Sequence, residues 1–322
     1  MIINPDTLAI HKPSKKLLEK LEENELQENV IAEFESDFHS ITIVENKIGR
    51  FLKYDQTYQA GYINSSNYKG NLPYINYFLI PFLMNLKIKN VLLVGFGSGI
   101  LVNNIEKITE LKSIDIVDIE ENIFQIATKY FDFKESEKQN FHLQDALIYL
   151  KTTKKKYDLI IVDVAGDEGI DDRFCDLEYL NLIKKHLTSG GIFVSNLPSS
   201  RDIFNPKNEF ALKQIELYKN NFNHVDIYNG ETSNKIYYKS FFDVDEIVFD
   251  VTNMILISSD KKYEVENSGL LDEILDVVPY LKDMVWFNTL EVFQFLRLFQ
   301  GNNEQGIAIL FQLFQCLVNK LS

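Results

Sequence analysis

The sequence predicts an α/β fold in which a doubly wound, mostly parallel sheet is covered by helices on both faces. Short apolar runs alternate with helix-forming segments along the middle of the chain. Strands that are apolar on both faces and joined by crossover helices are typical of a parallel sheet buried on each side. The apolar runs are residues 90–96, 113–119, 141–147, 157–165 and 191–197, and the helical segments between them include residues 121–131 and 177–188.

Antiparallel pieces are expected on either side of this sheet. Residues 224–230, 233–242 and 253–259 have the composition of later strands, antiparallel at the edge, that complete it. Residues 36–63 consist of short β-branched and aromatic runs separated by Asn, Gly and Asp, which predicts a small antiparallel β unit. Residues 72–87 are apolar and predict a helix despite Pro81.

Both ends of the chain are predicted to be helical. Apolar residues at helical spacing indicate an amphipathic helix over Ser14–Glu33, and the chain turns helical again from about residue 268. The expected organisation therefore has four parts. They are an N-terminal helical segment (1–34), a small β domain (35–70), a Rossmann-like domain (71–265) and a C-terminal helical extension (266–322).

The charge balance argues against polyanionic partners. The 322 residues include 33 basic and 47 acidic side chains, for a formal net charge of -14, which repels phosphate backbones and anionic membranes. We expect no nucleic-acid or membrane partner and a neutral or cationic small molecule instead. The N-terminus lacks a signal-peptide pattern, and no long apolar stretch occurs. With only Cys175 and Cys316, and no ligand spacing among the histidines, we expect a cytoplasmic protein without disulfides or a metal site.

A cluster of glycines follows the first predicted strand of the large domain. Gly95, Gly97 and Gly99 alternate with Phe96 and Ser98. Glycines so placed let the backbone turn sharply and approach a ligand that side chains would exclude. A dinucleotide fingerprint requires a further glycine at position 100, which is Ile here, whereas this spacing suits a loop that binds S-adenosylmethionine. A plain tight turn is the alternative.

Each of the next three predicted strands ends close to a carboxylate. Asp118 ends the second strand, where an adenosine ribose presents its two hydroxyls. Asp145 follows the third strand, where a carboxylate can accept from the adenine amino group. Asp163 follows the fourth, at the edge where open α/β sheets hold their ligands. The alternatives are a solvated strand-end carboxylate for Asp118 and a helix cap for Asp163.

Taken in order, the glycine loop and these carboxylate motifs resemble the polyamine aminopropyltransferases, of which spermidine synthase is the type. Upstream, Ser36–Ile41 resembles the family's Ser-Pro-Tyr-Gln segment, and Leu52–Gln59 resembles its Leu-Asp-Gly-x-x-Gln segment. Downstream, Phe174–Tyr179 resembles its Leu-Phe-x-x-x-Phe-Tyr helix start, and Leu187–Ile192 its Leu-x-x-Gly-Gly-Ile turn. The resemblance covers roughly residues 35–260.

The resemblance implies a role for several residues. Gln59 contacts the nucleoside, Asp118 the ribose and Asp145 the adenine, while Asp163 is the gatekeeping acid. An amine attacks the methylene beside a sulfonium only when unprotonated, so a carboxylate between the two orients the amine and accepts its proton. Family members commonly form dimers or tetramers, so a homo-oligomer is expected. The loop expected to hold the S-adenosyl donor comprises Gly95, Gly97, Ser98 and Gly99.

Three motifs depart from the family's pattern. Ser98 replaces an Asp that pairs with the amine of the decarboxylated donor, which moves the preference towards intact S-adenosylmethionine. A charge-assisted hydrogen bond contributes about 1.5–3 kcal/mol, and about 1.4 kcal/mol is a tenfold change in affinity. The family's Tyr-His-Glu motif becomes Tyr74-Ile75-Asn76, which keeps the tyrosine expected to bind the amine but loses the acid. The second acid of the loop after Asp163 is displaced to Asp167, a further amine-binding candidate unless this segment is only a solvated loop.

Three functions remain open on these observations. The first is transfer of an aminopropyl group from decarboxylated S-adenosylmethionine to a polyamine, favoured by Asp163, Gln59 and the N-terminal β unit. The second is methyl or other alkyl transfer from intact S-adenosylmethionine, favoured by Ser98 and Asn76. The third is a catalytically inactive homologue that retains the nucleoside site, suggested by the loss of two acids on the acceptor side.

Overall fold

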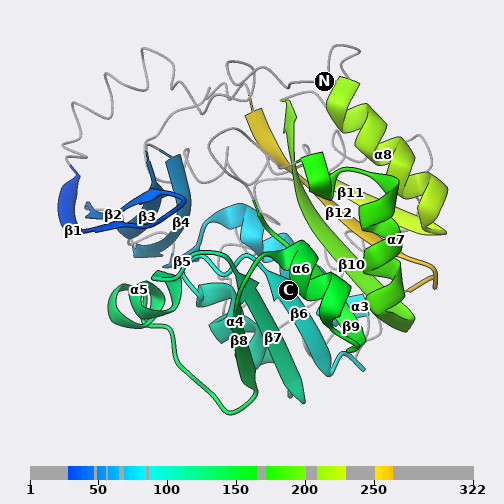
Figure 1. Cartoon of the computed structure of the whole chain (residues 1–322), viewed down its shortest axis with the longest axis horizontal. Coiled ribbons are helices and arrows are strands. Elements are labelled where there is room, and N and C mark those ends of the chain that lie inside the picture. The colour runs from blue at the N-terminus through cyan, green and yellow to red at the C-terminus, as the bar shows by residue number, and fades with distance from the viewer. Residues whose placement is uncertain are drawn as a thin grey trace, which may run out of the picture.

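Two β-sheets and the helices packed on them make up the described part of the chain (Figure 1). One is a five-stranded sheet near the N-terminus, and the other is a seven-stranded sheet flanked by helices. The predicted α/β class with a small N-terminal antiparallel unit is confirmed. The computed structural model describes residues 28–46, 49–55, 57–64, 69–84, 87–164, 172–200, 209–229 and 251–263.

The N-terminal sheet is antiparallel throughout, with its strands in sequence order. The strands are β1 (Asn29–Glu35), β2 (Ser40–Glu45), β3 (Gly49–Tyr54), β4 (Thr57–Asn64) and β5 (Lys69–Asn71). The helix predicted over Ser14–Glu33 is wrong at its C-terminal end, because residues 29–33 belong to β1. Pairing with β2 satisfies their backbone groups and overrides their helical spacing. The rest of that predicted helix lies outside the described residues.

The large sheet has the order β11-β12-β10-β9-β6-β7-β8. Its first five strands along the chain are parallel, while β12, one position in from the edge strand β11, runs antiparallel to β10 and β11. The strand predicted over residues 233–242 lies outside the described residues, as does the C-terminal extension. The strands are β6 (Asn90–Val94), β7 (Ser113–Asp118), β8 (Gln139–Leu143), β9 (Tyr157–Val162), β10 (Leu187–Ser200), β11 (His224–Asn229) and β12 (Val251–Ser259).

The helix predicted over residues 72–87 is divided in two. A 3₁₀ helix, η1 (Pro73–Leu79), leads into the short α3 (Ile80–Met84). Pro81 has no N–H to donate, so a continuous α-helical hydrogen-bond ladder cannot pass through it. The other helical elements are α4 (Ile100–Ile108), α5 (Ile123–Tyr130), α6 (Ala146–Thr152), η2 (Asp172–Phe174), α7 (Leu177–His186) and α8 (Glu209–Asn221). In the described part of the chain, no helix is long and apolar enough to cross a membrane.

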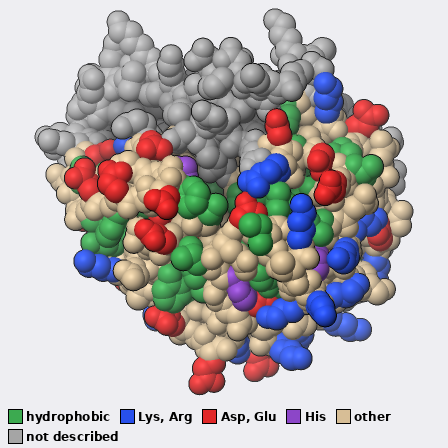
Figure 2. Space-filling view, in the orientation of Figure 1, with side chains coloured by type: hydrophobic (Ala, Val, Ile, Leu, Met, Phe, Trp, Pro, Cys, Tyr) green, Lys and Arg blue, Asp and Glu red, His purple; other side chains and the backbone are tan. Residues whose placement is uncertain are grey.

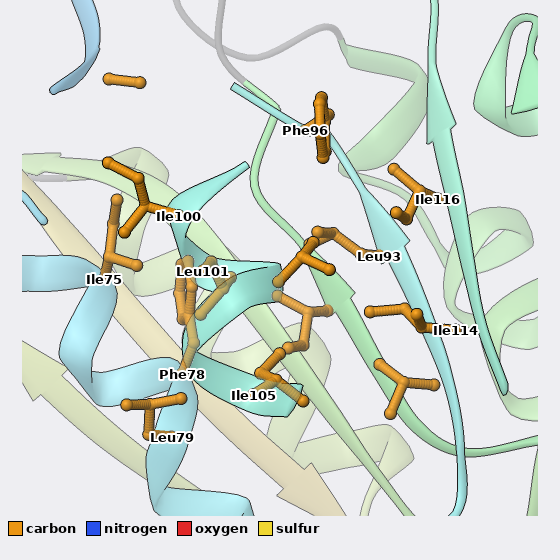
Figure 3. Close-up of a cluster of buried hydrophobic side chains, with 14 of the residues drawn as sticks. Ile75, Phe78, Leu79, Leu93, Phe96, Ile100, Leu101, Ile105, Ile114 and Ile116 are labelled. Atoms are coloured by element: carbon orange, nitrogen blue, oxygen red, sulfur yellow. The ribbon is translucent and has the colours of Figure 1, made fainter. Parts of the chain in front are cut away.

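Two apolar layers cover the faces of the large sheet. Side chains of α6, α7 and α8 form one layer. The other joins η1, α3, α4 and α5 to the strands and also takes in Ile41, Ile43 and Leu52 of the N-terminal sheet. Figure 3 shows Ile75 and Phe78 of η1 facing Leu101 and Ile105 of α4. One core therefore links the N-terminal sheet to the α/β part, and the four-part division stays a prediction.

The charged side chains are unevenly distributed. Figure 2 shows acidic side chains over the N-terminal sheet and basic ones at the lower right, over the ends of α6 and α7. Lysines occupy the last turn of every described α-helix from α4 to α8, where they interact favourably with the helix dipole. The C-terminal ends of the helices from α4 to α7 lie near the amino ends of the parallel strands. Basic charge therefore concentrates away from the carboxyl edge that carries the candidate site.

Candidate active site at the carboxyl edge of the large sheet

The glycine loop, Asp118 and Asp163 meet at one edge, as the sequence predicts. Strand β6 lies between β7 and β9, so the direction of winding reverses beside it, and open α/β sheets bind ligands in the crevice at such a point. The amide of Gly95 donates to the carbonyl of Val117 at 2.9 Å, and that of Asp163 donates to the carbonyl of Val94 at 2.9 Å. These two bonds tie the ends of the three strands together.

Side chains would be strained at the glycine positions of this loop. Gly95 has φ +87°, and a Cβ there would lie 2.1 Å from the carbonyl oxygen of Asp163. Gly97 has φ +55°, and a Cβ there would lie 3.3 Å from the Cβ of Ala60 in β4. Ser98 is 4% exposed, and Gly99 precedes α4 without a side-chain cap. The backbone conformation at Gly95 and Gly97 therefore favours glycine, and the loop's role in binding an S-adenosyl donor stays a prediction.

Asp118 ends β7 and holds the loop by backbone hydrogen bonds. Its Oδ2 accepts from the amide of Phe96 at 2.7 Å, and its Oδ1 accepts from the amide of Glu120 at 2.8 Å. Burial raises its pKa, and the charge of Glu120 adds to the rise, while the backbone donors oppose it. The carboxylate is therefore not free in solvent. Each oxygen retains a lone pair for a second donor such as a ribose hydroxyl.

Asp145 follows β8 and caps helix α6. Its Oδ1 accepts from the amides of Leu147 and Ile148, at 2.9 and 3.0 Å. Its Oδ2 lies 3.2 Å from Nη1 of Arg173. Both oxygens thus have partners that explain the residue structurally, and the contact with adenine stays a prediction.

Asp163 follows β9 directly and is held by two side chains. Its Oδ1 accepts from Nδ2 of Asn196 at 2.8 Å, and its Oδ2 accepts from the hydroxyl of Tyr74 at 3.3 Å. Burial raises its pKa to about 6, against the effect of these two hydrogen bonds. The next described α-helix, α7, is capped by Asp176 instead, which accepts from Tyr179. Asp163 is therefore half-buried with a pKa close to neutral, and its role as a base stays a prediction.

The N-terminal sheet closes one side of this edge. The hydroxyl of Ser36 donates to Oε2 of Glu120 at 2.6 Å, and Glu120 is 1% exposed. Burial raises the pKa of Tyr54, the last residue of β3, and the charges of Asp118 and Glu120 add to the rise. The ring of His39 stacks on Tyr54 with centroids 4.6 Å apart. The end of β3 therefore approaches the carboxylates at the end of β7.

Gln59 lies at an irregularity of β4. Lys53 pairs with Tyr58 and Leu52 pairs with Ala60, so Gln59 is an extra residue in its strand. Such bulges re-aim side chains and are frequent beside functional sites. Its neighbour Ala60 is the residue that encloses Gly97. This places Gln59 close to the glycine loop, while its contact with the nucleoside stays a prediction.

Two features of the site were not predicted. Asn196 contacts Asp163 from β10, and the signal in the sequence was a pair of polar residues, Ser195 and Asn196, within a buried apolar run. The Ser36–Glu120 hydrogen bond joins positions with no local pattern in common. Asp167 lies outside the described residues, and so does the side chain of Asn76. In the described part of the chain, no group of three or more His, Cys, Asp or Glu side chains could hold a metal ion.

Comparisons with known proteins agree with this architecture. A family model described as the spermine/spermidine synthase domain matches residues 78–228. A polyamine aminopropyltransferase of Vibrio vulnificus is 27% identical over 186 residues, which is 55% of this chain and 62% of that protein. The chain thus matches less than two thirds of that relative's length.

Solved structures show the same fold. Spermidine synthase from Thermotoga maritima aligns with a TM-score of 0.56 and 16% identity, over 72% of this chain and 73% of that one. A probable spermidine synthase from Corynebacterium glutamicum aligns with a TM-score of 0.57 and 14% identity, over 77% of this chain and 87% of that one. The chain is thus similar to the spermine/spermidine synthases over residues 78–228, just under half of its length.

Proposed function

We propose that this protein transfers an aminopropyl group from decarboxylated S-adenosylmethionine to a polyamine or similar small amine. The observation that carries the proposal is the setting of Asp163. Its carboxylate is held between Tyr74 and Asn196 with a pKa of about 6, and its backbone lies against Gly95 of the glycine loop. A base with that pKa is mostly ionised at pH 7 and can still accept a proton.

The residues of the edge fit such a donor. The glycine loop brings backbone rather than side chains to the edge at Gly95, Gly97 and Gly99, and Asp118 has lone pairs for two ribose hydroxyls. Ile119 and Leu143 are 40% and 54% exposed beside the ends of β7 and β8, and apolar side chains there suit the face of a nucleobase. When bound, the donor supplies a methylene made electrophilic by the adjacent sulfonium.

Asp163 has two tasks in the proposed reaction, which are to position the amine and to accept its proton. An alkyl amine is mostly protonated near pH 7, and the carboxylate holds it close to the donor's methylene. Asp163 first accepts a proton from the nitrogen, which frees the lone pair, and the neutral amine then attacks the methylene while the C–S bond breaks. The hydroxyl of Tyr74 in η1 orients the carboxylate by donating a hydrogen bond to its Oδ2. Asp167 and the acids near it are proposed to bind the distal charge of the amine.

A second candidate function uses intact S-adenosylmethionine for methyl or other alkyl transfer. It is favoured by the N-terminus of α4, which follows buried, uncharged Ser98 and has no side-chain cap. Unpaired amides at a helix N-terminus favour a carboxylate, which only the intact donor carries. The inactive homologue is less well supported, because the Tyr74–Asp163 contact is in place.

Several expectations accompany the proposal. They are a homo-oligomer, a cytoplasmic location and the absence of nucleic-acid and membrane partners, and all of them stay predictions.

The test is calorimetric titration with decarboxylated and intact S-adenosylmethionine, followed by product analysis with putrescine and spermidine. Preference for the decarboxylated donor and an aminopropylated product support the proposal. Preference for the intact donor, with a methylated product, supports the second candidate instead. Ser98→Asp is the matched variant. The new carboxylate should shift the ratio of the affinities for the decarboxylated and intact donors at least tenfold towards the decarboxylated one. That shift corresponds to a change of about 1.4 kcal/mol in relative binding free energy.

A further inference from the structure

Asp163, Asn196 and Asn253 come from three adjacent strands and face the same layer of the core. Strand β10 pairs with β9 on one side and β12 on the other. Because side chains two positions apart lie on one face of a strand, each of the three shares its face with a core residue. Those core residues are Ile161, Val194 and Ile255. The three polar side chains therefore form a row across the end of the sheet.

Only one orientation of the Asn196 side-chain amide lets it donate hydrogen bonds to both Asp163 and Asn253. Its Nδ2 donates to Oδ1 of Asp163 at 2.8 Å and to Oδ1 of Asn253 at 3.2 Å. Its own Oδ1 is buried without a hydrogen-bond partner among the described residues. Turning the amide over would direct that oxygen at two other acceptors. In this orientation the Asn196 oxygen has no hydrogen-bond partner among the described residues, while the two N–H groups donate to Asp163 and Asn253.

We propose that Asn253, acting through Asn196, reserves Oδ1 of Asp163 as a hydrogen-bond acceptor, so that the proton taken in the reaction binds Oδ2. The proposal rests on the proposed role of Asp163 as the base. Asn253 and Asn196 are positioning residues in this scheme. In the described part of the chain, the hydrogen-bond partner of Oδ1 is an N–H donor, which cannot accept from a protonated Oδ1.

Oδ2 of Asp163, which faces the Tyr74 hydroxyl, can take the proton. A tyrosine hydroxyl both donates and accepts, so it donates to Oδ2 while the carboxylate is ionised and can accept once Oδ2 is protonated. The proton comes from the amine nitrogen, whose lone pair forms the new C–N bond. The C–S bond of the donor breaks, and its electron pair stays on sulfur. No further reactant is needed.

Loss of the Asn253 oxygen should change how Asp163 titrates. Without that acceptor the Asn196 amide is free to turn, and its oxygen can then accept from a protonated Asp163. The acid form is stabilised and the ionised form loses a fixed donor, so the pKa of Asp163 should rise by about one unit. Among the described groups facing Asp163, Tyr74 from η1 is titratable, Asn196 from β10 is neutral, and the glycine loop contributes backbone.

The test is a carboxyl ¹³C NMR titration of Asp163, assigned by comparison with Asp163→Asn. Asn253→Ala should raise the titration midpoint by about one pH unit and move the acidic limb of kcat/KM upward by the same amount. Ile255→Val is the matched control, since it perturbs the same strand opposite Asn196 without touching the amides. Its midpoint should stay at the wild-type value.

An unchanged Asp163 midpoint in Asn253→Ala overturns the proposal. If that variant does not fold, Asn253→Val removes the same oxygen with a side chain better suited to a strand, and the same comparison applies. Failure of the proposed function is separate. Full turnover by Asp163→Asn would remove Asp163 as the base, while the NMR titration would still decide whether Asn253 sets its ionisation.

Discussion

The hydroxyl of Ser36 donates to the buried carboxylate of Glu120 at 2.6 Å, across 84 positions of sequence. Ser36 lies in the turn between β1 and β2, and Glu120 follows β7. The same hydroxyl oxygen accepts from the amides of Phe38 and His39, at 3.1 and 3.0 Å. One side chain therefore organises the turn of the N-terminal sheet and attaches it to the edge where the candidate site lies.

Ser36→Ala should lower the free energy of unfolding by about 1–3 kcal/mol, because a buried acceptor loses its donor. Urea denaturation measures the change. Ser40→Ala is the matched control, since its hydroxyl bonds to Glu35 at an exposed position and its loss should change stability by less than about 0.5 kcal/mol. Equal changes in the free energy of unfolding would mean that the hydrogen bond to Glu120 stabilises the protein no more than an exposed one does.

Asp118→Asn should weaken binding of the S-adenosyl donor at least tenfold. An amide has one acceptor oxygen, so either the amide of Phe96 or that of Glu120 would face an NH₂ group, and the ribose would lose a charged acceptor. Calorimetric titration gives the affinity. Glu121→Gln removes the same charge at a neighbouring exposed position and should leave it unchanged. Unaltered affinity in Asp118→Asn would contradict the ribose assignment.

Asp163→Asn should reduce turnover by a factor of about 10² or more, which is the usual contribution of a general base. Binding of the donor should change little, because the proposed nucleoside contacts lie on the loop and on Asp118. Single-turnover assays and calorimetry separate the two quantities. Asp172→Asn, an exposed acid of η2, serves as the control for a simple loss of charge. A fully active Asp163→Asn protein would exclude this residue from proton transfer.

The rate should depend on pH through Asp163. Burial raises its pKa from an ordinary 3.8 to about 6, and only the ionised form can accept a proton. We therefore expect kcat/KM to fall about tenfold for each pH unit below pH 6. A pH–rate profile measures the limb, with enzyme stability checked at each pH. A rate that stays flat down to pH 4.5 would show that a less buried group, or none, limits the reaction.

The same burial should make Asp163 costly for folding at neutral pH. Its folded-state pKa lies above the unfolded value, so its contribution to stability is present below about pH 4 and is lost as the pH rises through 6. The loss approaches about 3 kcal/mol, since each pKa unit corresponds to about 1.4 kcal/mol. Asp163→Asn should therefore be more stable than the wild type at pH 8 and closer to it at pH 4. Thermal denaturation at the two pH values checks the order.

Much of the large sheet could be predicted from the sequence. Apolar runs such as residues 157–165 and 191–197 cannot be solvated, and their spacing allows crossover helices, so parallel strands follow from local pattern alone. The same logic placed Asp118 and Asp163 at one edge, because parallel strands all end on the same side. Local sequence pattern was less reliable where strand pairing or a proline determines the secondary structure. Residues 29–33 read as helix and form a strand, and Pro81 divides a predicted helix.

The sequence by itself determined the α/β class, the glycine loop and the carboxylates that follow the strands. Only the tertiary structure decided what those carboxylates contact. Asp163 meets Tyr74, Asn196 and, through Asn196, Asn253, from elements as much as 90 positions away along the chain. Hydrogen bonds act over about 3 Å, and no periodicity in a sequence specifies which distant side chains approach that closely. The order of strands in the sheet and the packing of the N-terminal sheet against it set those distances.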